Sequence, residues 1–165
     1  LIAQRINLRY TPELRFKLDE SAEYAIHMDE LFSKIDKERK ERDIQRLLEL
    51  KDAAQKYIEE KSKFFDLKLS DGKIIVVPLK NIEEFKQEGD IMHHCVFTNE
   101  YFKKKDSLIL SARIGKKRIE TIEVNLKTLD VVQSRGVCNN NTEYHERIIQ
   151  LVKKNINLIR QKLTA

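Results

Sequence analysis

Three short segments in the C-terminal half of the chain constrain its fold more than any other feature. Residues 108–114, 122–126 and 131–137 place apolar side chains at alternate positions, which is the period of a β-strand with one buried face. Only a few residues connect each segment to the next, and connections this short join antiparallel neighbours. The pattern therefore predicts a three-stranded antiparallel meander.

A hairpin is predicted before this meander. Asp71-Gly72 separates two apolar segments, 67–69 and 74–77, and this dipeptide is typical of tight turns between antiparallel strands. Pro78 marks the end of a strand or an edge of the sheet, because proline cannot donate a hydrogen bond to a β-ladder. The predicted sheet thus combines a hairpin with the meander.

Two helices are predicted to pack on this sheet. Asn81 and Glu84 form a pair typical of a helix N-terminus, and Gly89 is expected to end that helix. A second helix is expected to begin at Asn141 or Thr142. Its predicted buried face carries Ile148, Ile149, Val152, Ile156 and Ile159. The predicted fold class is α+β, an antiparallel sheet of a hairpin and a three-stranded meander packed with helices.

The chain divides into three predicted segments. Residues 1–36 are expected to form a strand followed by a helix, because residues 14–18 alternate and an apolar stripe at helical spacing follows them. Residues 37–62 predict a charged amphipathic helix or linker. The charged run at 37–43 could equally join the helical stripes on either side into one long helix. Residues 63–165 hold the predicted α+β domain.

The composition bounds the partners and the location of the protein. The formal net charge of +5 permits contact with nucleic acid but does not demand it. Two cysteines and the lack of a visible secretory signal favour a cytoplasmic protein. No apolar segment approaches the ~20 residues that span a bilayer, so no membrane partner is expected.

An anion site is predicted where the last strand of the meander leaves the sheet. Free amides at a helix N-terminus attract anions, an arginine can clamp a phosphate, and a glycine lets the backbone approach it. Together with the basic turn of the meander, the candidate anion- or nucleic-acid-binding residues are Gln133, Arg135, Gly136, Asn139, Asn141, Lys116 and Lys117. The plain alternative is that the arginine pairs with a glutamate across strands and the asparagines only form a turn.

His94, Glu123 and Arg135 are the candidate catalytic residues. If the polar faces of the strands align, an imidazole, a carboxylate and a guanidinium converge around a bound phosphate. Such a group suits general acid–base cleavage of a nucleic acid.

Metal and thiol chemistry are weaker alternatives. His93, His94, Cys95, Cys138 and His145 are of the types that bind zinc, but their spacing matches no recognised ligand motif. A thiolate at Cys95 would need a neighbouring base, and adjacent strand residues point to opposite faces, so only His145 could pair with it through the fold. No cofactor is therefore expected, and zinc is the remaining option.

A group of motifs resembles the PcfJ-like family. The motifs are MHHCV at 92–96, Tyr101, SLILSAR at 107–113, RIETIEV at 118–124 and VVQSRGVCNNNTEYH at 131–145. PcfJ-like proteins are found on conjugative plasmids and related mobile elements, and their biochemical activity is not established. The resemblance extends from about residue 57 to residue 158 and implies a protein associated with such an element.

A second resemblance lies in the N-terminal segment. LRYTPELRF at 8–16, Asp19-Glu20-Ser21 and the residues from Met28 to Phe32 closely resemble the C-terminal end of ribosome-binding factor A. Members of that family are small KH-like proteins that assist maturation of the small ribosomal subunit. The resemblance implies that residues 1–36 are a strand–helix remnant of a KH-like domain.

Three functions therefore compete. The favoured one is a mobile-element-associated protein that binds RNA or DNA through a polar, phosphate-binding pocket. The first alternative is an interaction or structural module without catalysis, which presents the helix at 37–62 to a protein partner. The second is a fragment of a ribosome-assembly factor that binds the RNA of the small subunit.

Overall fold

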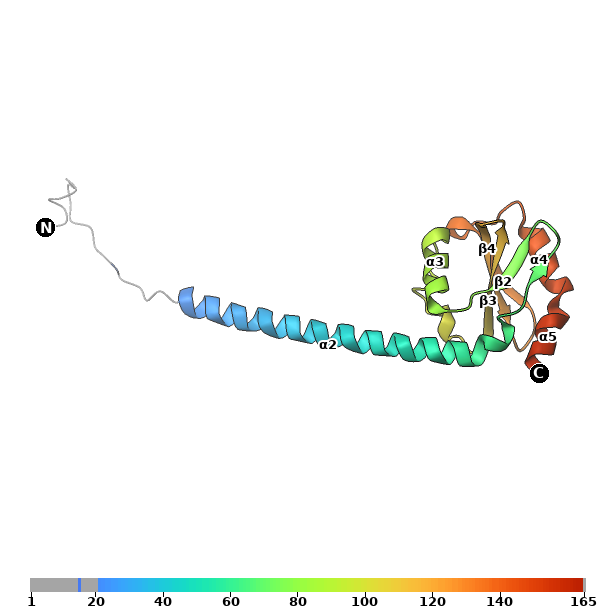
Figure 1. Cartoon of the computed structure of the whole chain (residues 1–165). Coiled ribbons are helices and arrows are strands. Elements are labelled where there is room, and N and C mark those ends of the chain that lie inside the picture. The colour runs from blue at the N-terminus through green and yellow to red at the C-terminus, as the bar shows by residue number, and fades with distance from the viewer. Residues whose placement is uncertain (1–14, 16–20, 165) are drawn as a thin grey trace, which may run out of the picture. The chain divides into compact units, whose positions relative to one another are not determined.

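The computed structural model in Figure 1 describes residue 15 and residues 21–164. They belong to two compact units, one up to Arg46 and the other from Leu47 onward. Of the strand predicted at 14–18, only Arg15 is described, so that prediction lies outside the described residues.

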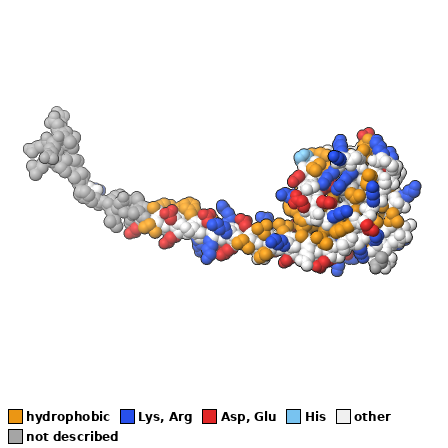
Figure 2. All heavy atoms as spheres, viewed as in Figure 1, with side chains coloured by type: hydrophobic (Ala, Val, Ile, Leu, Met, Phe, Trp, Pro, Cys, Tyr) orange, Lys and Arg blue, Asp and Glu red, His pale blue; other side chains and the backbone are white. Residues whose placement is uncertain are grey.

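Helix α2 (Ser21–Lys61) continues through the charged run without a break. The segment contains neither glycine nor proline and is rich in Glu, Lys, Arg, Leu and Ala, which have high helix propensity. Charged and apolar side chains alternate along its surface in Figure 2, and Phe32, Ile44 and Leu47 are exposed. The continuous helix is one of the two arrangements that the sequence left open. Among the described residues, no helix has the length and apolar character needed to cross a membrane.

Five antiparallel strands form one sheet in chain order (Figure 1). The strands are β1 (Leu69–Ser70), β2 (Ile75–Pro78), β3 (Ser107–Ile114), β4 (Lys117–Asn125) and β5 (Val131–Arg135). The pairing of β2 with β3 joins the predicted hairpin and meander. In the β1–β2 turn, Asp71 Oδ1 accepts the amides of Lys73 at 3.1 Å and Ile74 at 2.8 Å. Gly72 has a φ of +94°, which favours glycine. The predicted α+β class is confirmed.

Helices pack on both faces of the sheet. They are α3 (Ile82–Met92) on one face, and α4 (His145–Lys154) and α5 (Ile156–Thr164) on the other (Figure 1). Side chains alternate along a strand, so Leu108 and Leu110 pack with α4 and α5, whereas Ile109 packs with α3. Strand β3 is therefore buried on both faces, although the sequence pattern predicted burial on one.

The α3 boundaries agree with the prediction at one end only. Asn81 caps the helix as predicted, because its Oδ1 accepts the Glu84 amide at 2.9 Å. Gly89 does not end the helix, which continues to Met92. The left-handed residue at its C-terminus is His93, with a φ of 52°.

The β5–α4 connection also differs from the prediction. Strand β5 ends at Arg135, and α4 begins at His145, later than the predicted start at Asn141 or Thr142. Positive φ angles at Cys138 and Asn139, 53° and 61°, turn the backbone before a helix can form. The asparagine run therefore forms a shaped connection between the strand and the helix.

An irregularity in β4 decides which side chains face which helix. Ala112 pairs with Glu120 and Arg113 pairs with Arg118, so Ile119 is an extra residue in β4, as in a β-bulge. Ile119 packs in the α4–α5 core and Glu120 contacts α4, on the same face. Arg118 instead contacts α3 through Glu88. The bulge thus turns two neighbouring side chains toward the same helices.

Glu120 is a fully buried carboxylate that ties four parts of the domain together. Its Oε2 accepts hydrogen bonds from Ser134 Oγ on β5 at 2.5 Å and from His145 Nδ1 on α4 at 3.0 Å. Its Oε1 accepts from Thr142 in the connection, at 2.9 Å from the amide and 2.6 Å from the hydroxyl. Burial raises the pKa of Glu120, but these hydrogen bonds outweigh burial and lower its pKa below 4.5.

We expect Glu120→Gln to lower the free energy of unfolding by about 3 kcal/mol, because an amide cannot accept from all four donors. Urea denaturation followed by circular dichroism would measure the loss. Glu146→Gln is the matched control, since Glu146 is exposed on α4 and should leave stability within about 0.5 kcal/mol of the original. Equal stabilities of the two variants would contradict the role assigned to Glu120.

The same carboxylate predicts a dependence of stability on pH. Because folding lowers the pKa of Glu120, its contribution is fully present above pH 4.5 and is lost as the pH falls through the lowered pKa. The stability difference between the original protein and Glu120→Gln should therefore shrink on acidification below pH 4.5. Denaturation curves between neutral pH and pH 3 would measure this difference, and other carboxylates cancel because both proteins contain them. A difference that grew on acidification would contradict the prediction.

Candidate functional site

A cavity of about 320 Å³ opens on the face of the sheet that carries α3. Segments far apart in the sequence form its wall: the residues after α3, the middle of β4, the end of β5 and the β5–α4 connection. Its lining residues are His94, Cys95, Val96, Asn99, Tyr101, Ile109, Thr121, Ile122, Glu123, Gln133, Arg135 and Asn139. The structure thus brings together the three candidate catalytic residues and three of the candidate anion-binding residues, with Arg135 belonging to both groups.

Glu123 forms the centre of a polar network in this cavity. Its side chain is buried, and its Oε1 accepts hydrogen bonds from Lys104 Nζ at 2.9 Å and Ser107 Oγ at 2.7 Å. Its Oε2 accepts from Gln133 Nε2 at 3.0 Å, and the same amide nitrogen lies 3.0 Å from the Tyr101 hydroxyl. Because both oxygens are engaged, Glu123 is suited to positioning its neighbours.

Lys104 is held over an aromatic ring beside this network. Its ammonium lies 3.6 Å from the centre of the Tyr101 ring, within the range of a cation–π interaction. The ion pair with Glu123 fixes the other side of the same group. The Tyr101 ring and the Glu123 carboxylate therefore hold the Lys104 ammonium in place beside the cavity.

Arg135 is exposed at the end of β5 and lines the cavity. Its Nη1 donates a hydrogen bond of 2.8 Å to Asn141 Oδ1. Its neighbour on β4 is Thr121, so the alternative of a cross-strand pair with a glutamate is not found. No carboxylate among residues 21–164 pairs with this guanidinium, which is therefore oriented by an amide but not neutralised.

His94 enters the cavity from the residues that follow α3. Its amide donates to the Gly89 carbonyl at 3.2 Å, and a Cβ at Gly89 would lie 3.1 Å from the His94 carbonyl oxygen. A glycine at 89 therefore permits this close approach. The imidazole is half-buried, and its Nε2 lies 2.9 Å from Thr121 Oγ1. Burial lowers the pKa of His94 below 6.5, and the Glu88 carboxylate and the residue's own carbonyl offset this only in part.

The other candidate anion-binding residues lie outside this cavity. Asn141 and Lys117 line a second cavity of about 470 Å³, together with Arg118, Val137 and Tyr144, and Lys116 is exposed in the β3–β4 turn. Gly136 is buried, and a Cβ there would lie 2.6 Å from Thr142 Cγ2. The Gly136 position thus requires a glycine for packing.

One amide on which the expected anion site depends is not free in the structure. The Thr142 amide, which the sequence offered to an external anion, donates to the buried Glu120 carboxylate. The domain therefore supplies its own anion at this point, whereas Arg135 lines the cavity on the α3 face of the sheet.

The side chains considered for zinc do not converge. His145 is bound to Glu120 on the α4 face of the sheet, whereas His94 contacts Thr121 on the α3 face. Within residues 15 and 21–164, no three His, Cys, Asp or Glu side chains are arranged to hold a metal ion. Both cysteines are unpaired and exposed, and Cys95 lines the cavity.

Several residues of the site were not predicted from the sequence. Thr121 and Ser107 lie within the motifs of the PcfJ-like resemblance. Polar residues alternate with apolar ones along these strands, so a Ser or Thr there gave no reason to single it out. Glu88 on α3 is fully buried and contacts Thr121, yet it lies in a helix segment whose other acidic residues are mostly exposed. No sequence pattern marks such a residue, because its burial depends on how α3 packs.

The fold and the cavity define a class: an α+β domain whose antiparallel sheet carries a polar cleft on one face. The sequence model of the family described as PcfJ-like protein matches residues 24–149, which is most of the chain. The chain belongs to the PcfJ-like family.

The N-terminal part of the chain is similar to ribosome-binding factor A. The similarity is 51% identity over 35 residues with the protein of Clostridium botulinum (strain Eklund 17B / Type B) and 53% over 36 residues with that of Clostridium beijerinckii. These matches cover 21% and 22% of this chain, and 30% of each relative. The chain therefore spans less than a third of the length of these curated relatives. No solved structure matches the chain.

Proposed function

We propose that the cleft binds nucleic acid, with a backbone phosphate at Arg135. The observation that carries the proposal is a guanidinium that lines a cavity, is oriented by Asn141 and has no carboxylate partner among residues 21–164. A guanidinium can donate two parallel hydrogen bonds to phosphate oxygens, which gives geometry as well as charge. Binding a phosphate would neutralise the positive charge of Arg135.

The surroundings of Arg135 support a nucleic-acid ligand over a lone phosphate. Asn139 and the Gln133 side chain supply amide groups on the same cavity wall. Amides can bond to base edges and sugars, whereas the Arg135 guanidinium attracts the backbone. The resemblance to PcfJ-like proteins of conjugative plasmids and mobile elements agrees with a cytoplasmic protein that meets RNA or DNA.

Arg135→Ala should weaken binding of a single-stranded oligonucleotide roughly tenfold or more, because one charge-assisted contact is lost. The slope of log affinity against log salt should fall by about one. Fluorescence anisotropy with labelled RNA and DNA at several salt concentrations would measure both quantities.

Arg160→Ala is the matched control, because Arg160 is exposed on α5 and its loss changes the net charge equally. The control should keep the original affinity within about twofold if the contact is local. Equal losses in the two variants would indicate a general charge effect, and no binding by the original protein at low salt would refute the proposed function.

A second function is favoured by one observation. The N-terminal segment is 51% identical over 35 residues to one ribosome-binding factor A and 53% identical over 36 residues to another. In this alternative, the first unit directs the chain to the small ribosomal subunit. The full chain should then co-sediment with small but not large subunits on a sucrose gradient. Removal of residues 1–36 should abolish co-sedimentation, whereas Arg135→Ala should not, since the cleft lies in the second unit. Retention of binding without residues 1–36 would contradict this alternative.

A further inference from the structure

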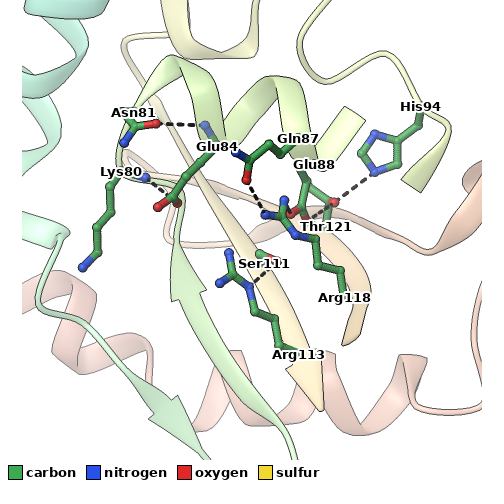
Figure 3. A network of polar contacts seen from close by, with 10 residues as sticks. All are labelled: Lys80, Asn81, Glu84, Gln87, Glu88, His94, Ser111, Arg113, Arg118 and Thr121. Atoms are coloured by element: carbon green, nitrogen blue, oxygen red, sulfur yellow. Dashed lines mark hydrogen bonds and ion pairs between the residues drawn. The ribbon is translucent and has the colours of Figure 1, made fainter. Parts of the chain in front are cut away.

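A chain of hydrogen bonds leads from a buried ion pair to the imidazole in the cleft. Glu88 on α3 is fully buried, and its Oε2 lies 2.5 Å from Arg118 Nη1 on β4. Its Oε1 accepts the hydroxyl of Thr121 at 2.7 Å, and Thr121 Oγ1 lies 2.9 Å from His94 Nε2. Figure 3 shows these four side chains converging from α3, β4 and the residues after α3.

The donors and acceptors in this chain determine where the imidazole carries its proton. A carboxylate accepts hydrogen bonds and a guanidinium donates them, so the only hydrogen of the Thr121 hydroxyl is directed at Glu88. Thr121 Oγ1 then has only lone pairs to offer to His94, which requires a hydrogen on Nε2. In the neutral imidazole, the lone pair is consequently on Nδ1. No other side chain within residues 21–164 forms a hydrogen bond with Nδ1.

We propose that His94 is a general base in the cleft, that Thr121 and Glu88 are its positioning residues, and that the substrate class is RNA. The proposal rests on the proposed binding of nucleic acid. It adds a reaction, since His94, which can accept a proton, and Arg135, a cation for the phosphate, line the same cavity. RNA supplies the matching proton, because a 2′-hydroxyl lies next to every phosphodiester.

The reaction is transesterification within the RNA. Nδ1 of His94 takes the proton of the 2′-hydroxyl, the 2′ oxygen bonds to the adjacent phosphorus, and the bond from phosphorus to the 5′ oxygen breaks. The leaving 5′ oxygen takes a proton from solvent water, and the hydroxide formed takes the proton from His94. The products are a 2′,3′-cyclic phosphate and a 5′-hydroxyl, and the protein returns to its initial state. Arg135 stabilises the additional negative charge on the phosphate oxygens.

Charged and titratable groups face His94 from each neighbouring element. They are Glu88 on α3, Arg118 and Glu123 on β4, Arg135 on β5, and Cys95, Tyr101 and Lys104 in the residues between α3 and β3. Glu88 and Glu123 are each paired with a cation, Arg118 and Lys104 respectively. Any pH dependence of the reaction must therefore be assigned by substitution of His94 itself.

The tautomer can be measured without substrate. A long-range ¹H–¹⁵N spectrum of the full chain at neutral pH should show His94 protonated on Nε2 and not on Nδ1, with the signal assigned by its absence from His94→Ala. Thr121→Val should remove this preference and expose the Nε2 proton to exchange with water. Thr121→Ser, which keeps the hydroxyl, should restore both properties. A proton on Nδ1 in the original protein, or no difference between the two Thr121 variants, would overturn the proposal.

The reaction is tested with RNA oligonucleotides and DNA of the same sequence. The original protein should cleave RNA to a 2′,3′-cyclic phosphate and leave DNA intact. His94→Ala should reduce the rate roughly 100-fold or more with binding retained, and Thr121→Val should reduce it roughly tenfold. Thr121→Ser should act at nearly the original rate. The acidic limb of the rate–pH profile should disappear in His94→Ala.

Different results would overturn RNA binding and RNA cleavage. RNA that binds with the predicted dependence on Arg135 but is not cleaved would overturn the catalytic proposal and leave the proposed function standing. RNA that does not bind would overturn both. Cleavage that persists in His94→Ala would show that another group is the base and would also overturn the proposal.

Discussion

The structure depends on the requirement that a carboxylate removed from water must find donors for both of its oxygens. Transfer of an unpaired carboxylate to the protein interior costs several kcal/mol, a large part of the stability of a small domain. Glu120 meets this requirement with Ser134, Thr142 and His145, which belong to β5, the connection and α4. The position of the connection, and with it the wall of the cleft, is fixed by this buried charge.

The central position of β4 explains why one strand serves both faces. β4 lies between β3 and β5, and its irregularity at Ile119 changes the alternation of its side chains. Glu120 therefore binds the connection and α4 on one face of the sheet, while Thr121 and Glu123 line the cleft on the other face. A site on a strand that is paired on both edges is held more precisely than a site on a loop.

The two carboxylates at the cleft, Glu88 and Glu123, form ion pairs within the domain. Glu88 is paired with Arg118 and Glu123 with Lys104, and hydroxyl or amide donors complete both sets of bonds. Within the described part of the chain, the guanidinium of Arg135 has no carboxylate partner and Nδ1 of His94 has no side-chain partner. A cation and a proton acceptor are thus what this site offers, which is why a phosphate next to a hydroxyl is the ligand proposed for it.

The sequence by itself determined the α+β class, the hairpin at Asp71-Gly72, the antiparallel meander and the cap at Asn81. These features depend on local periodicity and turn chemistry, which neighbouring residues carry. It also singled out His94, Glu123 and Arg135: Glu123 and Arg135 are polar side chains on apolar strands, and His94 belongs to the His-His-Cys run. Only the tertiary structure decided that the Thr142 amide binds Glu120 and that α4 starts at His145. It also decided that Glu88 is linked to His94 through the Thr121 hydroxyl. Those outcomes depend on which segments meet in space and on the need to pair buried charges, and no local pattern records either.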